Sequence, residues 1–164
     1  MSQMDRTGPV TDVPKHNRLK VLLLSGLLVG TLDITAACIQ TLVNGGDPLK
    51  MLRFVASGLL GKEALAGGTL ISFYGLVFHY CIAMIWTCLF FFLYPRLKLE
   101  RFNTILVGIL YGAFVWTIMT RVILPLSAAP ALKFKLLPAV IAMSILIVAI
   151  GLPLSFIARK YYRN

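Results

Sequence analysis

Four long runs of apolar residues limit what this chain can fold into. They cover residues 21–43, 69–94, 103–126 and 137–158. A helix needs about 20 predominantly apolar residues to cross the hydrocarbon core of a bilayer. Each run is long enough for one crossing, so the sequence predicts an all-α polytopic membrane protein with four transmembrane helices.

The composition excludes an ordinary soluble domain. Apolar residues make up 59% of the 164 residues and charged residues 13%, whereas soluble domains contain about 45–50% and about 25%. The formal net charge of +10 does not indicate a nucleic-acid partner. The basic residues lie in short runs beside the apolar segments, where topology signals and contacts to anionic headgroups are expected. The expected partner is therefore the lipid bilayer.

The chain is expected to form a single domain. Residues 1–17 have little apolar content and contain two prolines, which is typical of a flexible tail. Residues 18–164 hold all four spans, and no internal repeat or low-complexity tract divides them.

A short helix is predicted between the first two spans. Asp47 suits an N-cap and Pro48 suits the first helical position. Residues 48–60 are too few to cross a membrane. Lys50, Arg53 and Ser57 recur in them at helical spacing, so we expect an amphipathic helix that lies at the membrane interface.

The basic residues also predict the orientation of the chain. With four spans, both termini and the loop between the second and third spans lie on one side. That side holds ten lysines and arginines, and the other side holds six. Basic segments resist translocation, so both termini are expected in the cytoplasm. The ten are Arg6, Lys15, Arg18, Lys20, Arg96, Lys98, Arg101, Arg159, Lys160 and Arg163, and the six are Lys50, Arg53, Lys62, Arg121, Lys133 and Lys135.

Two ionisable residues inside the spans form a candidate intramembrane polar pair. Asp33 lies 13 residues past Lys20, and His79 lies 15 residues before Tyr94 on the antiparallel second span. At helical rise these separations place Asp33 and His79 at depths of ~20 and ~22 Å from the cytoplasmic ends of their spans. An ionisable group in hydrocarbon is costly and suggests a function. A hydrogen bond between the two would either fix helix register or carry proton or ion chemistry.

Arg121 and two glycine pairs complete the candidate residues. Arg121 lies near the outer end of the third span, where its side chain can snorkel to the surface, face the mouth of a cavity or hold a lipid phosphate. Gly26 with Gly30, and Gly108 with Gly112, have the four-residue spacing that lets helices approach closely. We expect these faces to pack within the bundle, with a homo-oligomeric contact as the alternative.

The cysteines predict neither a metal site nor a disulfide framework. Cys38, Cys81 and Cys88 all fall inside spans, without metal-ligand spacing. We therefore expect no catalytic residue, metal or cofactor. Cys38 also ends a Thr-Ala-Ala-Cys run that is similar to the cleavage site of a lipoprotein signal peptide. Asp33 interrupts the apolar segment before it, and apolar residues continue beyond it, which favours a membrane span.

Part of the chain resembles a known family. The residues that carry the resemblance are His79, the turn Tyr94-Pro95-Arg96-Leu97-Lys98, the glycines at 108 and 112, and Leu124-Pro125-Leu126. This pattern is similar to that of small bacterial four-helix inner-membrane proteins of unknown function, and it covers about a third of the chain. The resemblance implies an inner-membrane location and no particular biochemistry.

Three functions are compatible with these features. The first is a non-enzymatic accessory, assembly or stress-response component, because most polar residues are explained by packing and interfaces. The second is a small oligomeric transporter or proton or ion channel that uses Asp33 and His79. The third is a membrane enzyme that acts on lipid, which would need clustered carboxylates or histidines near an interface, whereas His16 lies alone in the tail.

Overall fold

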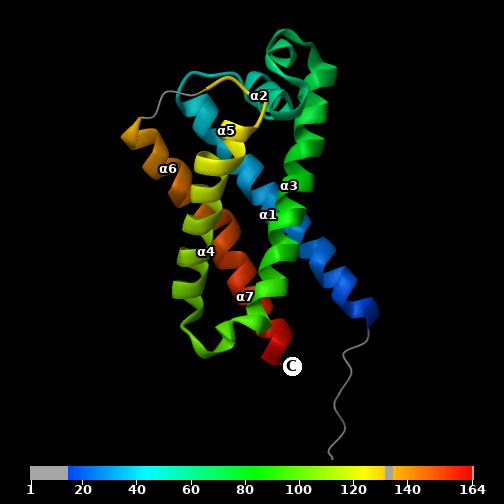
Figure 1. Ribbon diagram of the computed structural model, residues 1–164, viewed down its shortest axis with the longest axis vertical. Coiled ribbons are helices and arrows are strands. Elements are labelled where there is room, and N and C mark those ends of the chain that lie inside the picture. The colour runs from blue at the N-terminus through cyan, green and yellow to red at the C-terminus, as the bar shows by residue number, and fades with distance from the viewer. Residues whose placement is uncertain (1–14, 132–134, 164) are drawn as a thin grey trace, which may run out of the picture.

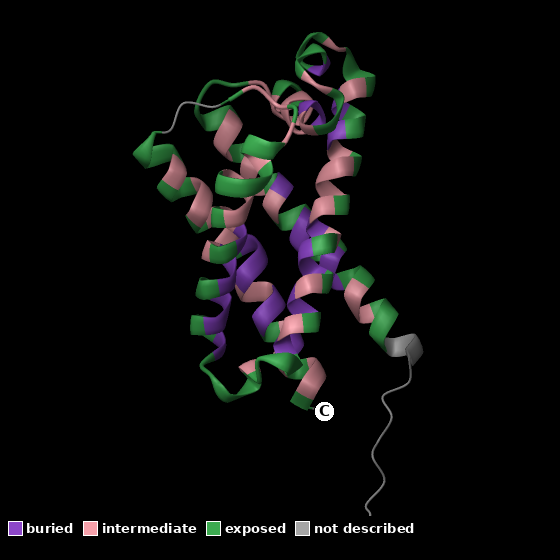
Figure 2. Cartoon of the chain, in the orientation of Figure 1, coloured by how far each residue is buried: buried purple, intermediate pink, exposed green. Residues whose placement is uncertain are grey.

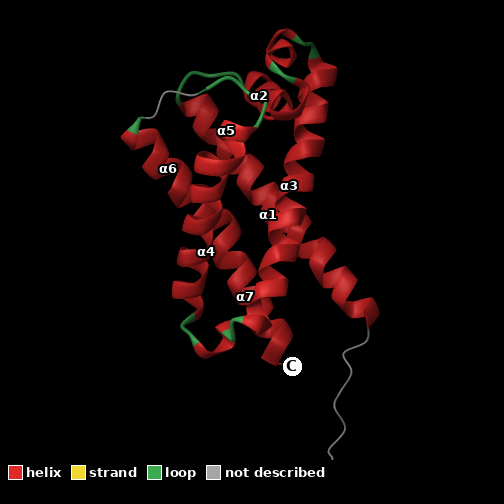
Figure 3. Ribbon diagram, in the orientation of Figure 1, coloured by secondary structure: helices red, strands yellow, loops and turns green. Residues whose placement is uncertain are grey.

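A computed structural model describes residues 15–131 and 135–163, and all its regular structure is helical (Figure 3). Four helices are long and apolar enough to cross a membrane, at residues 18–43, 69–96, 104–126 and 136–163. The all-α prediction with four candidate spans is therefore confirmed. The elements in chain order are α1 (Lys15–Val43), α2 (Pro48–Leu60), η1 (Lys62–Ala66), α3 (Thr69–Arg96), η2 (Leu99–Arg101), α4 (Thr104–Ile118), η3 (Met119–Ile123), α5 (Leu124–Leu126), α6 (Leu136–Leu146), η4 (Ile147–Gly151) and α7 (Leu152–Arg163).

The ends of the helices differ from the predicted ones by a few residues. Helix α1 already begins at Lys15, inside the predicted tail, and residues 1–14 lie outside the described part of the chain. The fourth span continues to Arg163 rather than ending at residue 158, because its last residues form an amphipathic rather than a wholly apolar helix. Asn103 is the N-cap of α4 and not its first residue.

The four spans form a bundle whose two ends differ (Figure 1). The start of α1, the turn between α3 and α4, and the C-terminal end of α7 lie at one end, and α2 with η1 covers the other. The close backbone contacts pair α1 with α3, and α4 with η4 and α7. Buried residues gather where these helices meet (Figure 2), in a core that includes Val29, Phe90, Tyr111 and Leu154.

The short helix α2 runs from Pro48 to Leu60, as its sequence predicts. The Asp47 carboxylate caps it by accepting a hydrogen bond from the Leu49 amide at 2.8 Å. The polar stripe on α2 does not form one solvent-facing surface, however. Lys50 is exposed, whereas Arg53 is only 16% exposed and donates to the Gly67 carbonyl at 2.9 Å. Ser57 is fully buried, so part of this stripe docks α2 onto the bundle.

Two of the spans contain a π-helical turn, η3 in the third span and η4 in the fourth. Each ends two residues before a proline, Pro125 or Pro153. A proline inside a helix cannot donate a backbone hydrogen bond, and its ring clashes with the carbonyl four residues earlier. A wider turn ahead of the proline relieves this clash without breaking the span.

Candidate intramembrane site

Asp33 on α1 and His79 on α3 come together in the middle of the bundle. The His79 Nε2 atom lies 4.0 Å from the Asp33 Oδ2 atom, and the two side chains are 13% and 17% exposed. The similar depths calculated from the sequence reflect this arrangement, since α1 and α3 run antiparallel in close contact. Electrostatic interaction between the two polar groups across 4.0 Å is stronger in a low-dielectric interior than it would be in water.

The direct hydrogen-bond partner of His79 is a backbone group. Its Nε2 atom lies 2.9 Å from the Gly30 carbonyl oxygen, closer than to the carboxylate. A carbonyl oxygen can only accept, so Nε2 carries a proton and donates it to Gly30. The imidazole therefore joins α3 to the backbone of α1, one turn away from Asp33.

A second polar contact joins the same two helices. The Thr31 hydroxyl donates to the Leu27 carbonyl at 2.8 Å and lies 2.9 Å from the Tyr80 hydroxyl. Because the threonine hydroxyl has a single proton, the tyrosine must donate in this contact. Two neighbouring hydrogen bonds thus join the helices. One links residue 79 of α3 to residue 30 of α1, and the other links residue 80 to residue 31.

The first glycine pair lies where α1 meets α3. A methyl group at Gly26 would lie 2.6 Å from the Met84 sulfur, and one at Gly30 would lie 2.9 Å from the Tyr80 ring. The absence of side chains lets the helices approach closely enough for the His79 bond to form.

The second glycine pair lies where α4 meets the fourth span. A methyl group at Gly112 would lie 2.5 Å from the Ile147 Cα atom, and one at Gly108 would lie 2.9 Å from the Leu152 Cα atom. Gly151, which was not among the residues predicted from the sequence, lies closer still to α4. A methyl group added there would lie 2.0 Å from the Gly108 carbonyl oxygen. A search for small residues opposite the predicted glycine pair could have found it.

One face of α3 carries residues 72, 75, 79 and 83, most of them small, and this face contacts two different helices. Its second half, with His79, packs on α1, but its first half packs on α2. A methyl group at Gly75 would lie 1.9 Å from the Leu52 carbonyl oxygen, and the Ser72 hydroxyl donates to the Leu49 carbonyl at 3.0 Å. No pattern in the sequence indicated that the short helix would cover this half of the face.

The remaining candidate, Arg121, lies on the exposed surface of η3. This turn is at the end of the bundle that carries α2 (Figure 1). The position is compatible with a snorkelling side chain. The structure thus brings Asp33, His79 and Gly30 together, and it leaves Arg121 far along a different helix.

At the opposite end of the bundle, Tyr94 and Tyr162 join α3 to α7. Tyr94 is only 2% exposed and stacks on Tyr162 with 5.3 Å between ring centroids. The Tyr162 hydroxyl donates to the Phe91 carbonyl at 2.9 Å. These rings join the end of α7 to α3, so they belong to the core of the bundle.

Within residues 15–131 and 135–163, no three histidine, cysteine, aspartate or glutamate side chains gather as a metal site would require. Comparison with protein families, with curated proteins and with solved structures finds no match. The resemblance drawn from the sequence therefore stays a hypothesis, and the functional argument depends on the geometry.

Proposed function

We propose that this chain is a multi-pass inner-membrane protein that acts without catalysing a reaction, as an accessory, assembly or stress-response component. The observation that carries this proposal is the hydrogen bond from His79 Nε2 to the Gly30 carbonyl at 2.9 Å. It joins an ionisable side chain to the backbone of the neighbouring helix. A polar group used in this way holds two spans in register.

The surrounding polar groups support the same function. Proton or ion transfer through the membrane needs polar groups in succession that can exchange partners. Thr31 and Tyr80 instead bond to each other, and the threonine proton is used within its own helix. The intramembrane polar residues of α1 and α3 therefore contribute to the contact between these helices.

A small oligomeric transporter or proton or ion channel is the alternative. The Asp33 carboxylate favours it, because it lies 4.0 Å from His79 and is 17% exposed, which leaves its oxygens able to accept a proton. Four helices enclose little space, so such a route would have to run between copies of the chain.

Proton flux distinguishes these functions. Purified protein in liposomes with an internal pH-sensitive dye is expected to show the same proton uptake as protein-free liposomes under an imposed membrane potential. The Asp33→Asn variant serves as the matched control. Uptake by the native protein that disappears in this variant would overturn the accessory role and support the channel.

The orientation that we propose places both termini in the cytoplasm. The first turn of α1 and the C-terminal end of α7 lie at the same end of the bundle, opposite α2 (Figure 1). The excess of basic residues at this end supports the assignment. Lys50 and Arg121 then lie at the outer surface, where we propose that Arg121 contacts a lipid phosphate.

Thiol labelling tests both the orientation and the docking of α2. In a background without the native cysteines, Lys50→Cys in intact cells is expected to react readily with an impermeant reagent, because Lys50 is exposed. Arg53→Cys is expected to react much more slowly, because Arg53 is 16% exposed. Labelling at residue 50 only after lysis would reverse the orientation, and equal rates in the folded protein would contradict the docked α2.

A further inference from the structure

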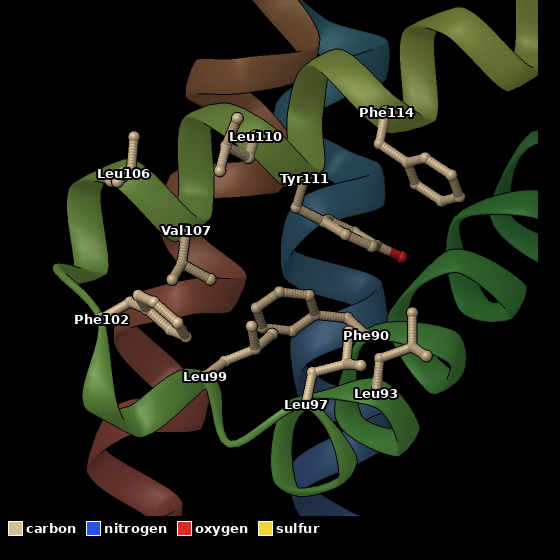
Figure 4. Close-up of a pocket in the computed structure, with 10 residues that line it drawn as sticks. All are labelled: Phe90, Leu93, Leu97, Leu99, Phe102, Leu106, Val107, Leu110, Tyr111 and Phe114. Carbon is tan, nitrogen blue, oxygen red and sulfur yellow. The ribbon is translucent and has the colours of Figure 1, made fainter.

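A groove of about 420 Å³ lies between α3 and α4 (Figure 4), at the end of the bundle that carries the C-terminus (Figure 1). Phe90 and Leu97 contribute from the α3 side, Leu106, Leu110 and Phe114 contribute from α4, and Phe102 closes one end. The groove exists because α3 and α4 meet through aromatic rings, such as Phe90 on Tyr111 at 4.5 Å and Trp86 on Phe114 at 6.0 Å. Its volume is in the range of ligand sites, about 300 to 1,000 Å³.

The groove offers its occupant carbon surface without hydrogen-bonding groups. The side chains that line it are leucine, valine and phenylalanine, except for one tyrosine. That tyrosine, Tyr111, donates its hydroxyl proton to the Trp86 carbonyl at 2.6 Å. A polar ligand would lose its hydration without compensation, so the lining selects a hydrocarbon chain.

The length of the groove fits one lipid tail. On α4 its lining extends from Leu106 to Phe114, which are eight residues apart. At helical rise this is ~12 Å, and Phe102 extends the groove beyond the start of α4. The groove therefore covers most of the depth of one leaflet, which is half of the ~30 Å hydrocarbon core and the depth that a single acyl chain reaches.

The turn that closes the groove separates apolar from charged residues. Leu97, Leu99 and Phe102 line the groove, whereas Lys98 and Arg101 are exposed. Lys98 has a φ of 51°, a left-handed conformation that is unfavourable for lysine and that reverses the chain between the two leucines. Although Glu100 is also exposed, Arg96 adds a third basic residue beside the turn, so the mouth of the groove carries a positive net charge.

We propose that this groove binds one acyl chain of an anionic phospholipid, whose phosphate lies against Lys98 and Arg101. The apolar lining holds the tail, and the basic turn selects the headgroup. A second copy of the chain would instead insert a side chain or helix, which would require no anionic lipid. This inference does not depend on the proposed function, because it concerns α3 and α4 rather than the His79 contact.

Bromine quenching of tryptophan fluorescence tests the proposal. The chain has two tryptophans, so Trp116→Phe leaves Trp86, which contacts Phe114 at the groove, as the reporter. In nanodiscs we expect brominated phosphatidylglycerol to quench Trp86 at a lower mole fraction than brominated phosphatidylcholine. A basic residue beside an anionic headgroup contributes about 1 kcal/mol, which corresponds to roughly a fivefold preference for the anionic lipid over the zwitterionic one. Lys98→Gln with Arg101→Gln should therefore lower the preference at least severalfold.

Matched variants locate the bound chain. Leu110→Phe adds volume in the groove, whereas Ile109→Phe introduces the same ring on an exposed part of α4 outside it. We expect quenching to fall only in Leu110→Phe. Lys160→Gln removes an exposed charge from α7 and should leave the lipid preference unchanged.

Several results would overturn the proposal. Equal quenching by both lipids would exclude headgroup selection, and a loss of preference in Lys160→Gln would show that overall charge is responsible. Equal quenching in the two phenylalanine variants would place the chain elsewhere. Weak quenching in every lipid, together with disulfide cross-links between copies through Leu110→Cys, would show that a second copy occupies the groove.

Discussion

Gly151→Ala is expected to lower the free energy of unfolding by about 3 kcal/mol or more, which is at or above the upper end of usual overpacking effects. A methyl group there would lie 2.0 Å from the Gly108 carbonyl oxygen and 2.9 Å from the Gly112 nitrogen. Both are backbone atoms of α4, so no side-chain rotation can relieve the clash. The fourth span would have to move away from α4.

Two further glycines provide controls for this prediction. Gly26→Ala should cost less, because the atom that it meets is the flexible Met84 sulfur. Gly58→Ala on α2 meets nothing closer than the Ser127 Cβ atom at 3.9 Å, so the higher helix propensity of alanine should stabilise the protein by about 0.5–1 kcal/mol. Reversible unfolding in mixed micelles measures all three. A Gly151→Ala variant as stable as Gly58→Ala would contradict the close contact of α4 with the fourth span.

The features that could be predicted well from the sequence depend on local properties. Span number follows from the length of apolar runs, and the start of α2 follows from an aspartate and a proline at adjacent positions, 47 and 48. The proximity of Asp33 and His79 could also be predicted, because helical rise converts residue numbers into depth. Each of these inferences needs only one helix or one antiparallel pair.

Other features depend on which helices meet, and a hydropathy pattern does not contain this information. The parts of α4 and of the fourth span that meet are apolar on every side, so Gly151 could not be matched to Gly108 in advance. For the same reason, the burial of Tyr94 against Tyr162 could not be predicted. Arg53 was expected on the polar face of an interfacial helix, whereas it donates to the Gly67 carbonyl from a largely buried position.

Substituting His79 is expected to destabilise the protein more than substituting Asp33. His79→Phe keeps a ring but removes the bond to the Gly30 carbonyl, and it leaves the Asp33 carboxylate without the polar imidazole nitrogen that lies 4.0 Å away. Leaving a buried polar group unsatisfied costs about 1–3 kcal/mol. Asp33→Asn leaves the His79 bond to Gly30 in place, so its cost should lie near the lower end of that range.

The double variant measures the coupling between the two side chains. Asp33→Asn with His79→Phe should cost less than the sum of the single changes, because an interaction between two side chains that are in contact can be lost only once. Coupling energies of polar side-chain contacts between membrane helices average about 0.6 kcal/mol and reach about 1.7 kcal/mol. We expect the coupling energy of Asp33 and His79 to lie in this range.

Two controls separate the roles of His79. Asp33→Asn with Tyr111→Phe combines contacts of different helices, and these effects should add. His79→Gln retains an amide that can donate to the Gly30 carbonyl, so it should recover most of the stability lost in His79→Phe. If the Asp33 and His79 effects simply add, the carboxylate does not interact with the imidazole. If His79→Gln is as unstable as His79→Phe, the ionic contact is more important than the bond to Gly30. The register of α1 against α3 would then depend on charge, and the case for proton chemistry at this pair would strengthen.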